Sequence, residues 1–445
     1  MMMCIVMTMI SCNKKAPVSI EQTGDHGIIL TPEEKTAGLM TPEILWKFGR
    51  LGSIALSPDG SSVLYTVTRI DLKSEARETD IYKIASAGGD PVKLTTGGGS
   101  SPQWFDSGKK IAFVRGGELY AMNSDGSDQK KIEGLEGFEL FRISPSGDRI
   151  LFTKRVKLDQ TANEKHGMPR AKVRIIDDLM YRHWNYWSDY SYSHIFIASF
   201  NGSSVSGEKD IMEGQKFESP VPPYFDESEI SWSPDGKHIA YTTKRLRGKE
   251  DAVSTNSDIF LYDISTGNEI NISEGNKGYD RYPVFSPDGS KIAYQSMERD
   301  GYESDLDRLF VYDISGGTRS WVTEGWTYDV SAINWADENT LFFSCAHHGT
   351  AQVFRTSLTG KEVSKVTEGV HDLSALSFRS GILVAQQNSM SMAPEVAKVD
   401  VNTGEVRQIS FINRPIYESI KMGRVDEKNI KTKDRKDLQM WLIYP

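Results

Sequence analysis

The sequence predicts an all-β fold: a seven-bladed β-propeller of four-stranded antiparallel blades, with a short N-terminal helix before it and the start of another domain after it. Three observations predict it. A Ser-Pro-Asp-Gly-type turn recurs along the chain, a short apolar run follows each copy, and successive copies are 39 to 89 residues apart. Repeats of about 40–50 residues are typical of propeller blades. The chain has 445 residues, 38% of them hydrophobic, which is enough for such an array.

Composition excludes several classes of function. The net charge of −9 argues against a nucleic-acid-binding protein, which needs clustered Lys and Arg. The three cysteines are too few, and two of them too close to the N-terminus, for a disulfide framework. No apolar run reaches about 18 residues, and the histidines lack metal-ligand spacings. We therefore expect no transmembrane helix, metal or cofactor, and we expect His347 and His348 to point apart along a strand.

Residues 1–12 have the features of a targeting segment. The first ten residues are apolar, and Ser11 precedes Cys12. This pattern resembles a bacterial lipoprotein signal, in which the cysteine receives the lipid. It predicts lipidation of Cys12, membrane attachment through that lipid, and a location in the bacterial cell envelope, either periplasmic or membrane-anchored. No Lys or Arg precedes the apolar run, so an N-terminus without a targeting role stays open.

Residues 13–50 are predicted to form an N-terminal segment with one short helix. Residues 13–40 are polar, and we expect them to lack regular structure. Thr41 is a suitable N-cap, Pro42 fits the first turn, and Glu43 is favourable near the positive end of a helix.

The propeller is predicted over residues 51–415. In the recurring turn, Pro presets φ, Asp caps its own backbone, and Gly accepts a positive φ. The apolar run after each turn is expected to be a strand buried on both faces. The last residue of the turn is Gly60, Gly108, Gly147, Gly236, Gly289, Asn339 and Gly381 in the successive copies, and the third strands are expected to begin near Asp80, Glu118, His194, Asp258, Arg308, Gln352 and Glu395.

The longest spacing between turns, 89 residues, contains only one clear third strand and one clear fourth strand. We interpret it as a single blade with an insertion over residues 156–190. An eighth, degenerate blade is the alternative. After the propeller, residues 416–445 leave the repeat, and residues 438–445 alternate like a strand behind a polar turn.

The turn repeats occur in several propeller groups, but three stretches narrow the choice: residues 181–189 (YRHWNYWSD), 274–310 and 434–445. These stretches resemble the propeller of the acylaminoacyl-peptidase and dipeptidyl-peptidase branch of the prolyl oligopeptidase family. The resemblance covers about residues 41–445. It implies a C-terminal α/β-hydrolase domain as the partner of this propeller, with a Ser-Asp-His triad and a Gly-x-Ser-x-Gly nucleophile turn.

No Gly-x-Ser-x-Gly occurs in this sequence. The resemblance therefore implies that the triad lies beyond Pro445, and that residues 416–445 are a linker and the first strand of the hydrolase domain. No residue of this chain is a candidate catalytic residue, and we expect the chain alone to be inactive.

The candidate substrate-binding residues lie in two places. Tyr181, Arg182, His183, Trp184 and Trp187, with Tyr186, occupy the insertion, where they line a substrate pocket or pack the insertion onto its blade. The forked donors of Arg182 suit a peptide carbonyl or carboxylate.

The second place is a loop between the second and third strands of a later blade, which carries Glu303 and Asp305. A carboxylate there would recognise the free amino terminus of a peptide, and a solvated acidic turn is the alternative. Cys345 is expected to be a buried strand residue.

The leading hypothesis for function is the substrate-gating propeller of a secreted serine peptidase that cleaves short peptides, of the dipeptidyl or acylaminoacyl type. The propeller would admit short peptides and exclude folded proteins, and a homodimer is compatible with this function. The alternative is a non-enzymatic, TolB-like envelope propeller that acts as a protein-binding scaffold.

Overall fold

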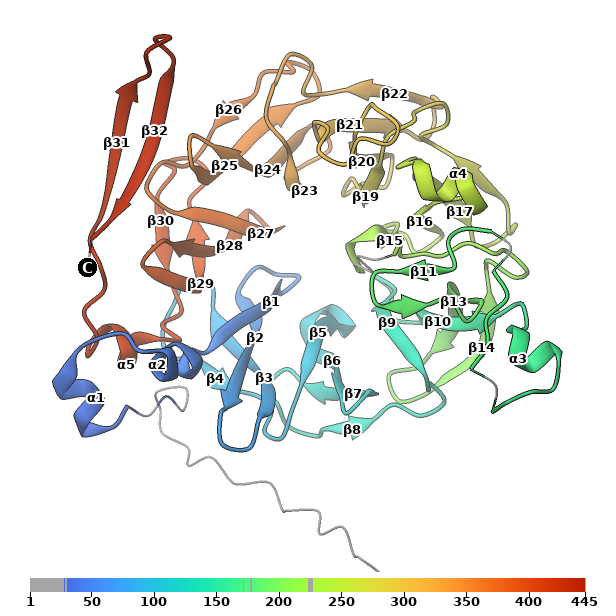
Figure 1. Ribbon diagram of the computed structural model, residues 1–445, viewed down its shortest axis with the longest axis horizontal. Coiled ribbons are helices and arrows are strands. Elements are labelled where there is room, and N and C mark those ends of the chain that lie inside the picture. The colour runs from blue at the N-terminus through green and yellow to red at the C-terminus, as the bar shows by residue number, and fades with distance from the viewer. Residues whose placement is uncertain (1–27, 29, 171, 177, 223–226, 445) are drawn as a thin grey trace, which may run out of the picture.

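The computed structural model describes residues 28, 30–170, 172–176, 178–222 and 227–444. Within these residues, seven four-stranded antiparallel sheets are arranged in a ring around a central axis (Figure 1). The fold is a seven-bladed β-propeller, as the repeats predict. The 89-residue spacing corresponds to one blade with a long insertion.

Each blade uses four strands in chain order, interrupted only in blade 3 by the strands of the insertion, and the first strand lies nearest the centre (Figure 1). The strands of blades 1 to 4 are β1 (Arg50–Leu56), β2 (Ser62–Asp71), β3 (Ala76–Ala85) and β4 (Val92–Lys93); β5 (Ser100–Phe105), β6 (Lys110–Arg115), β7 (Glu118–Asn123) and β8 (Lys130–Lys131); β9 (Phe138–Ile143), β10 (Arg149–Lys157), β13 (Ser191–Phe200) and β14 (Val205–Asp210); and β15 (Ile230–Trp232), β16 (His238–Thr243), β17 (Asp258–Asp263) and β18 (Glu269–Asn271). Those of blades 5 to 7 are β19 (Asp280–Phe285), β20 (Lys291–Ser296), β21 (Arg308–Asp313) and β22 (Thr318–Trp321); β23 (Ser331–Trp335), β24 (Thr340–His347), β25 (Thr350–Ser357) and β26 (Ser364–Lys365); and β27 (Asp372–Arg379), β28 (Ile382–Ser389), β29 (Met392–Val399) and β30 (Val406–Gln408).

A pair of aromatic rings stabilises the middle of six blades. The two rings come from directly opposed residues of the second and third strands, and their centroids are 5.5 to 5.9 Å apart. Cross-strand aromatic pairs are among the most stabilising pairs in antiparallel sheets. In blade 7 the equivalent pair is Ala385 and Ala397. The six pairs are Tyr65–Tyr82, Phe113–Tyr120, Phe152–Phe196, Tyr241–Phe260, Tyr294–Phe310 and Phe343–Phe354.

Tryptophans at the ends of inner strands connect neighbouring blades. The indole N–H of Trp104 in blade 2 donates to the Ala55 carbonyl of blade 1 at 3.0 Å. The indole N–H of Trp335 in blade 6 donates to the Val284 carbonyl of blade 5, also at 3.0 Å. Each bond satisfies a buried donor and fixes the position of one blade against the preceding one.

The N-terminal segment contains two helices. Helix α2 (Pro42–Lys47) begins as predicted, because the Thr41 hydroxyl caps the N–H of Ile44. The expectation that residues 13–40 lack regular structure is wrong for α1 (Pro32–Ala37), which begins with a capping box formed by Thr31 and Glu34. Residues 28, 30–31 and 38–40 form no helix or strand, as expected, and residues 13–27 and 29 lie outside the described residues.

After blade 7 the chain forms helix α5 (Arg414–Tyr417) and then an antiparallel hairpin of β31 (Val425–Lys431) and β32 (Asp437–Ile443). The predicted strand over residues 438–445 is β32, and β31 and α5 were not predicted. The hairpin stands beside the ring (Figure 1) and contacts blade 6, where the Gln439 amide donates to the His348 carbonyl at 2.8 Å.

Candidate functional site

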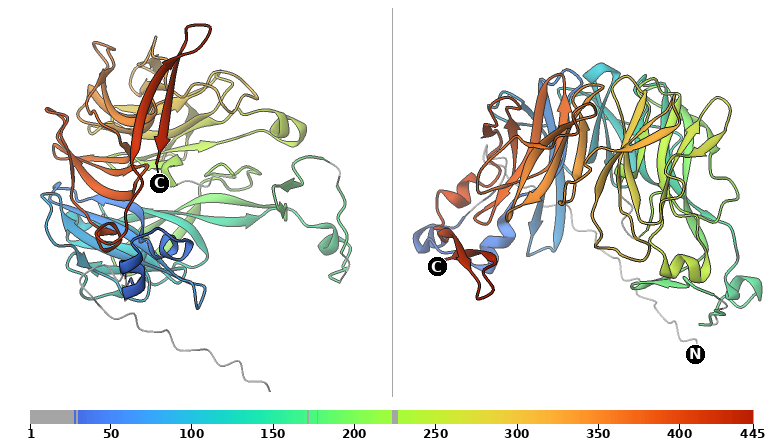
Figure 2. Two further views of the ribbon diagram at one scale, coloured as in Figure 1. Left: turned by 60° about the vertical axis from the view of Figure 1, so that its left-hand side comes forward. Right: turned by 90° about the horizontal axis from the view of Figure 1, so that it is seen from above.

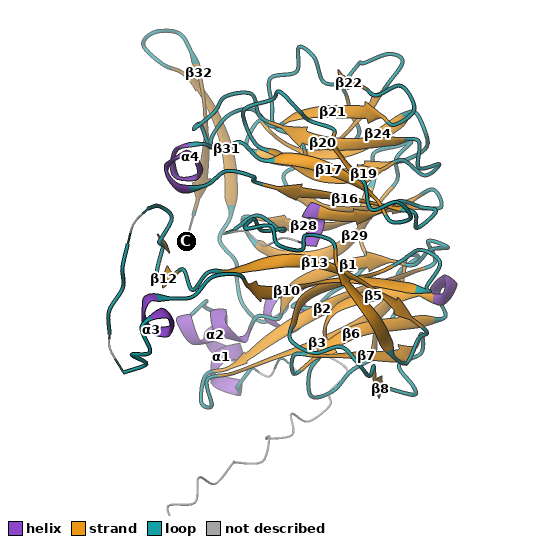
Figure 3. Ribbon diagram, turned by 90° about the vertical axis from the view of Figure 1, so that its right-hand side faces the viewer, coloured by secondary structure: helices purple, strands orange, loops and turns teal. Residues whose placement is uncertain are grey.

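One face of the propeller carries the long connections, and we call it the loop face. It is the face on which the second strand of each blade turns into the third. Helices α1, α2, α3 (Ala162–Lys165) and α4 (Gly248–Val253), together with strands β12 (Tyr186–Trp187) and β31, all lie on this side of the molecule (Figure 3). The right-hand view in Figure 2, in which the molecule is seen from above, shows the same arrangement. Every candidate substrate-binding residue lies in a connection on the loop face.

The insertion in blade 3 extends outward from the loop face as an arm, which we define as residues 158–190 (Figure 3). At its root, Arg155 pairs with Glu218 at 2.5 Å and with Asp189 at 4.0 Å. The Leu158 N–H donates to the Tyr190 carbonyl at 3.1 Å, which closes the two ends of the arm. These contacts hold the arm on its blade.

The aromatic residues of the arm lie in a short hairpin formed by β11 (Arg182–His183) and β12. The Tyr181 ring stacks on Trp187 at 5.8 Å, and His183 stacks on Tyr186 at 5.9 Å. Trp184 is 72% exposed and Trp187 is 39% exposed. The aromatic rings therefore pack mainly on one another rather than on the blade. The structure places Tyr181, Arg182, His183, Trp184 and Trp187 together in this hairpin.

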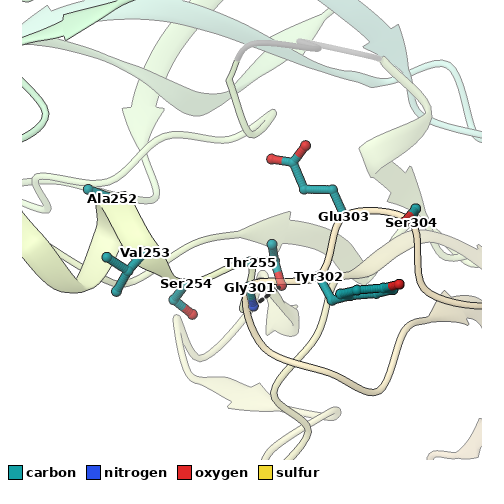
Figure 4. A pocket seen from close by; sticks show the side chains of 8 residues that line it. All are labelled: Ala252, Val253, Ser254, Thr255, Gly301, Tyr302, Glu303 and Ser304. Carbon is teal, nitrogen blue, oxygen red and sulfur yellow. Dashed lines mark hydrogen bonds between the residues drawn. The ribbon is translucent and has the colours of Figure 1, made fainter.

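Glu303 lies apart from the hairpin, in the loop between β20 and β21 of blade 5, where it was predicted. This loop and the end of α4 border a cavity of about 620 Å³ (Figure 4). The carboxylate of Asp300 fixes the cavity wall by accepting from the Ser254 hydroxyl at 2.5 Å and the Thr255 N–H at 3.1 Å. Glu303 forms no hydrogen bond or ion pair within the described residues, so its charge is available to a ligand.

Asp305 has a structural role. It pairs with Arg299 at 2.8 Å and accepts backbone N–H groups of its own loop. The hydrogen bond from Arg299 holds the pKa of Asp305 well below its usual range. This carboxylate shapes the loop that presents Glu303.

Two further carboxylates lie near the root of the arm, and the sequence did not single them out. Glu139, on the innermost strand β9, accepts from the Ser193 hydroxyl at 2.6 Å. Glu218 accepts from the Ser193 N–H at 3.4 Å. Burial raises the pKa of Glu218, the Arg155 guanidinium opposes this rise, and the negative charge of Glu139 adds to it. Ser193 therefore joins the two carboxylates, and Glu218 also pairs with the Arg155 guanidinium.

No local signal identified Glu139, Glu218 or Arg155, because they are 16 to 79 residues apart in sequence. Only the blade register, in which the second strand of blade 3 pairs with the first and third, brings them together.

The two adjacent histidines differ from the prediction. His347 and His348 do not point apart, because their ring centroids are 4.1 Å from each other. The alternation of a strand ends at His347, and His348 lies in the turn with φ of +51°. Cys345 is a buried residue of β24, as predicted, and burial raises the pKa of its thiol to about 11.

Three further expectations concern the lipidation of Cys12, a metal site and a membrane-spanning helix. Cys12 lies outside the described residues. Among the residues that the structure describes, no group of three or more His, Cys, Asp or Glu side chains is placed to hold a metal ion. In the same residues, no helix has the length and hydropathy needed to cross a membrane.

Comparisons with known proteins agree with the fold. A family model described as a TolB beta propeller domain matches residues 228–415. Dipeptidyl-peptidase 5 of Porphyromonas gingivalis is 35% identical over 415 residues, which cover 91% of this chain and 60% of that protein. Dipeptidyl-peptidase 5 of Porphyromonas endodontalis is 33% identical over 424 residues, or 93% of this chain and 61% of that protein. The chain thus spans about three fifths of the length of these relatives.

Solved structures show the same propeller. An acylaminoacyl peptidase of Pyrococcus horikoshii superposes with a TM-score of 0.69 at 17% identity, covering 92% of this chain and 59% of that one. The β-propeller domain of the Trilobed protease from Pyrococcus furiosus, described as having an open velcro topology, superposes with a TM-score of 0.54 at 16% identity. The match covers 82% of this chain and 99% of that domain.

Proposed function

Because this chain corresponds to the N-terminal β-propeller region of the dipeptidyl-peptidase 5 and acylaminoacyl-peptidase homologues of the prolyl oligopeptidase family, we propose that it is the substrate-gating propeller of a secreted serine peptidase that cleaves short peptides. The homologues pair their propeller with an α/β-hydrolase domain. The sequence has no Gly-x-Ser-x-Gly, so in this proposal the hydrolase domain performs the acyl transfer.

One observation carries the proposal: the arm, α4 and the loop containing Glu303 all lie on the loop face (Figure 3). A catalytic domain seated on this face would enclose these segments between itself and the propeller. The enclosed space would admit an extended peptide and exclude a folded domain, which is wider than the openings between loops. The propeller would thus select substrates by size.

The unpaired carboxylate of Glu303 supports a dipeptidyl rather than an acylaminoacyl preference. A dipeptidyl peptidase must bind a free ammonium group, and a partly desolvated ammonium group needs an anionic partner. Glu303 stands at the edge of a cavity with that charge available. An acylated amino terminus carries no charge and gains nothing from this carboxylate.

The proposal is tested first on the gene. Reading the coding sequence downstream of the Pro445 codon should reveal an in-frame Gly-x-Ser-x-Gly, followed by Asp and His. The full-length protein should then hydrolyse fluorogenic dipeptidyl amides with a free amino terminus faster than their N-acetylated forms. A stop codon at this position, with no hydrolase domain encoded nearby, would overturn the peptidase proposal.

A substitution of Glu303 tests whether its carboxylate binds the ammonium group of the substrate. Glu303→Gln should raise KM for the free dipeptidyl substrate about 10- to 100-fold, since one charge-assisted contact is worth about 1.5–3 kcal/mol, while kcat changes little. Glu362→Gln is the matched control, because Glu362 is an exposed carboxylate in the turn between β25 and β26 on the opposite face. Equal KM values for Glu303→Gln and the unmodified protein would remove Glu303 from the substrate site.

A second function is supported by the family model, which describes a TolB propeller over blades 4 to 7. In this alternative the propeller is a scaffold in the envelope that binds another protein and hydrolyses nothing. A stop codon after Pro445 and a stable stoichiometric protein complex isolated from the native envelope would favour it.

The location of the protein belongs to the same proposal. We propose that Cys12 is the lipid attachment site and that the protein is held in the bacterial envelope, based on the Ser11-Cys12 pair after an apolar run. Metabolic labelling with a palmitate analogue should mark the protein, and Cys12→Ser should abolish the label. Labelling that persists in Cys12→Ser would exclude this cysteine.

A further inference from the structure

Two arginines of the arm lie against the same indole ring. The guanidinium carbon of Arg174 is 4.2 Å from the centre of the Trp187 ring, and that of Arg182 is 5.5 Å from it. The Arg182 Nε also donates to the Trp184 carbonyl at 2.8 Å. A guanidinium stacked on an aromatic ring is held in a fixed plane, and its remaining N–H groups stay free to donate.

Neither guanidinium has a carboxylate partner among the residues that the structure describes. The acidic residues of the arm that the structure describes contact other groups: Asp189 pairs with Arg155, Glu164 with Lys157 at 2.5 Å and Asp159 with Lys216, and Asp178 accepts from the N–H of Leu179 at 2.8 Å. Among the described residues, these two exposed cations on one ring have no counter-charge, so they repel each other and favour an anion between or beside them.

The segment that ends before Asp177 is basic. Residues 165–176 contain four Lys or Arg residues, in a chain with a net charge of −9. Ten large apolar side chains are exposed in the arm, all between Met168 and Trp187. A surface that combines fixed guanidinium groups with exposed apolar and aromatic side chains suits a ligand with a carboxylate and an apolar body.

We propose that Arg174 and Arg182, oriented by Trp187, form a binding site for the C-terminal carboxylate of a short peptide. This inference rests on the proposed function and names its substrate class: peptides short enough that a free C-terminus reaches the arm. The planar fork of each guanidinium matches a carboxylate in bidentate geometry. Exposed rings such as Trp184 and Tyr181 cover the apolar side chains near that end.

The inference also gives the peptide a direction across the loop face. The cationic arm belongs to blade 3, whereas the unpaired carboxylate of Glu303 lies on blade 5. A short peptide with both termini free carries a positive and a negative end. Its amino terminus is attracted to Glu303 and its C-terminus to the arm, so that one orientation is favoured over the reverse.

The experiment compares two peptides on this chain by isothermal titration calorimetry. The probes are Ala-Phe-Ala-Ala with a free C-terminal acid and the same peptide as its C-terminal amide. The free acid should bind about tenfold more tightly than the amide, because a charge-assisted pair adds about one decade of affinity. In Arg174→Glu and Arg182→Glu this ratio should fall to about one, and Arg174→Lys should restore part of it.

Arg170→Glu is the matched control, because it makes the same charge change in the same segment at a residue without a stacking contact to Trp187. It should keep most of the preference for the acid. Circular dichroism and the Tm of each variant confirm folding. Equal binding of acid and amide by the unmodified chain, or no binding of either peptide, would overturn the site, whereas the proposed function is decided by the downstream coding sequence.

Two other outcomes would also overturn the site. If Arg170→Glu and Arg174→Glu lost the preference for the free acid equally, the preference would come from the overall positive charge of the segment and not from the two arginines stacked on Trp187. Inorganic phosphate that displaces the free acid with the affinity of the peptide itself would show a general anion site.

Discussion

At the scale of single residues, Asp280 is a buried carboxylate between blades 4 and 5 whose pKa is strongly raised. It is fully buried at the start of β19. The side-chain amide of Asn276 donates to both of its carboxylate oxygens at 3.1 Å. Burial is the main cause that raises the pKa of Asp280 to about 7, and these hydrogen bonds only partly oppose it.

This burial predicts a pH dependence of stability. The folded protein keeps the Asp280 proton up to about pH 7, whereas the unfolded chain releases it near its ordinary pKa of 3.8. The contribution of Asp280 to stability is therefore fully present below the unfolded pKa and is lost as the pH rises toward 7. Asp280→Asn should remove this contribution, so that the loss of Tm between pH 5 and pH 8 becomes smaller than in the unmodified protein.

The measurement is thermal unfolding at several pH values for both proteins. Asp313→Asn is a suitable control, because Asp313 is only partly buried and the hydrogen bonds that it accepts from Gly316 and Ser315 lower its pKa. It should leave the slope between pH 5 and pH 8 unchanged. An unchanged slope in Asp280→Asn would contradict the assignment of that slope to Asp280.

Residues whose role depends on near neighbours could be predicted from the sequence. The turn glycines Gly60 and Gly236 have φ of +74° and +67°, as the Ser-Pro-Asp-Gly pattern requires, and Thr41 caps the predicted helix. Residues whose partners come from distant segments could not. Nothing near Arg174 in the sequence indicates that it packs on Trp187, since the two are brought together only by the path of the arm.

At the scale of elements, the arm is held on two blades rather than one. Its root is in blade 3, and Asp178 lies against Gly248, the first residue of α4 in blade 4. A Cβ atom built on Gly248 would lie 2.2 Å from the Asp178 carboxylate, and Gly248 has φ of +58°. The close approach requires glycine at this position.

Gly248→Ala is therefore expected to displace the arm from α4. The new methyl group meets Asp178, and the positive φ adds about 1–2 kcal/mol of backbone strain. Backbone amides of residues 172–182 should exchange with deuterium faster, while those of the blade strands keep their rates. Gly116→Ala is the control, since it has φ of +60° but nothing within 4 Å of the added Cβ. Equal exchange of the arm in both variants would show that a general loss of stability, not contact with Asp178, explains the effect.

Strands were easier to predict than the elements between them. The apolar run after each turn marks β2, β6 and their counterparts because these strands are buried on both sides by neighbouring strands. The arm lacks this periodicity: its hairpin has two residues in each strand and is stabilised by aromatic stacking. An insertion was predictable from its length, but not the direction in which it leaves the blade.

At the scale of the whole molecule, the ring closes without a shared strand. Blade 1 uses only strands from the N-terminal side and blade 7 only strands from the C-terminal side. Apolar residues of both blades form one cluster at the seam, including Tyr65 and Val67 of blade 1 with Val384 and Val396 of blade 7. Closure thus depends on side-chain packing and a few hydrogen bonds.

Asn413 provides the most specific of these bonds. It is fully buried, accepts from the Gly49 N–H at 2.8 Å, and donates to the Gly49 carbonyl at 3.0 Å. The carboxylate of Glu395 in blade 7 positions it by accepting the N–H of Asn413 at 3.1 Å and that of Ile412 at 2.9 Å. A chain of hydrogen bonds therefore runs from blade 7 through Asn413 to the residue just before blade 1.

Asn413→Ala should destabilise the contact between blades 1 and 7 more than it destabilises any single blade. It leaves the Gly49 N–H and carbonyl buried without a partner, which costs about 2–4 kcal/mol for the two groups. Because the seam is the one junction where the chain does not continue from blade to blade, the loss should appear there first. Amides of blades 1 and 7 should exchange faster together, at denaturant concentrations that leave blades 3 to 5 protected.

The control is Asn402→Ala, at an exposed turn residue between β29 and β30, which should change neither the stability nor the exchange rates of blades 1 and 7. A uniform loss of protection in all seven blades of Asn413→Ala would instead show that the ring unfolds as one unit, and that opening at the seam is not separable from unfolding.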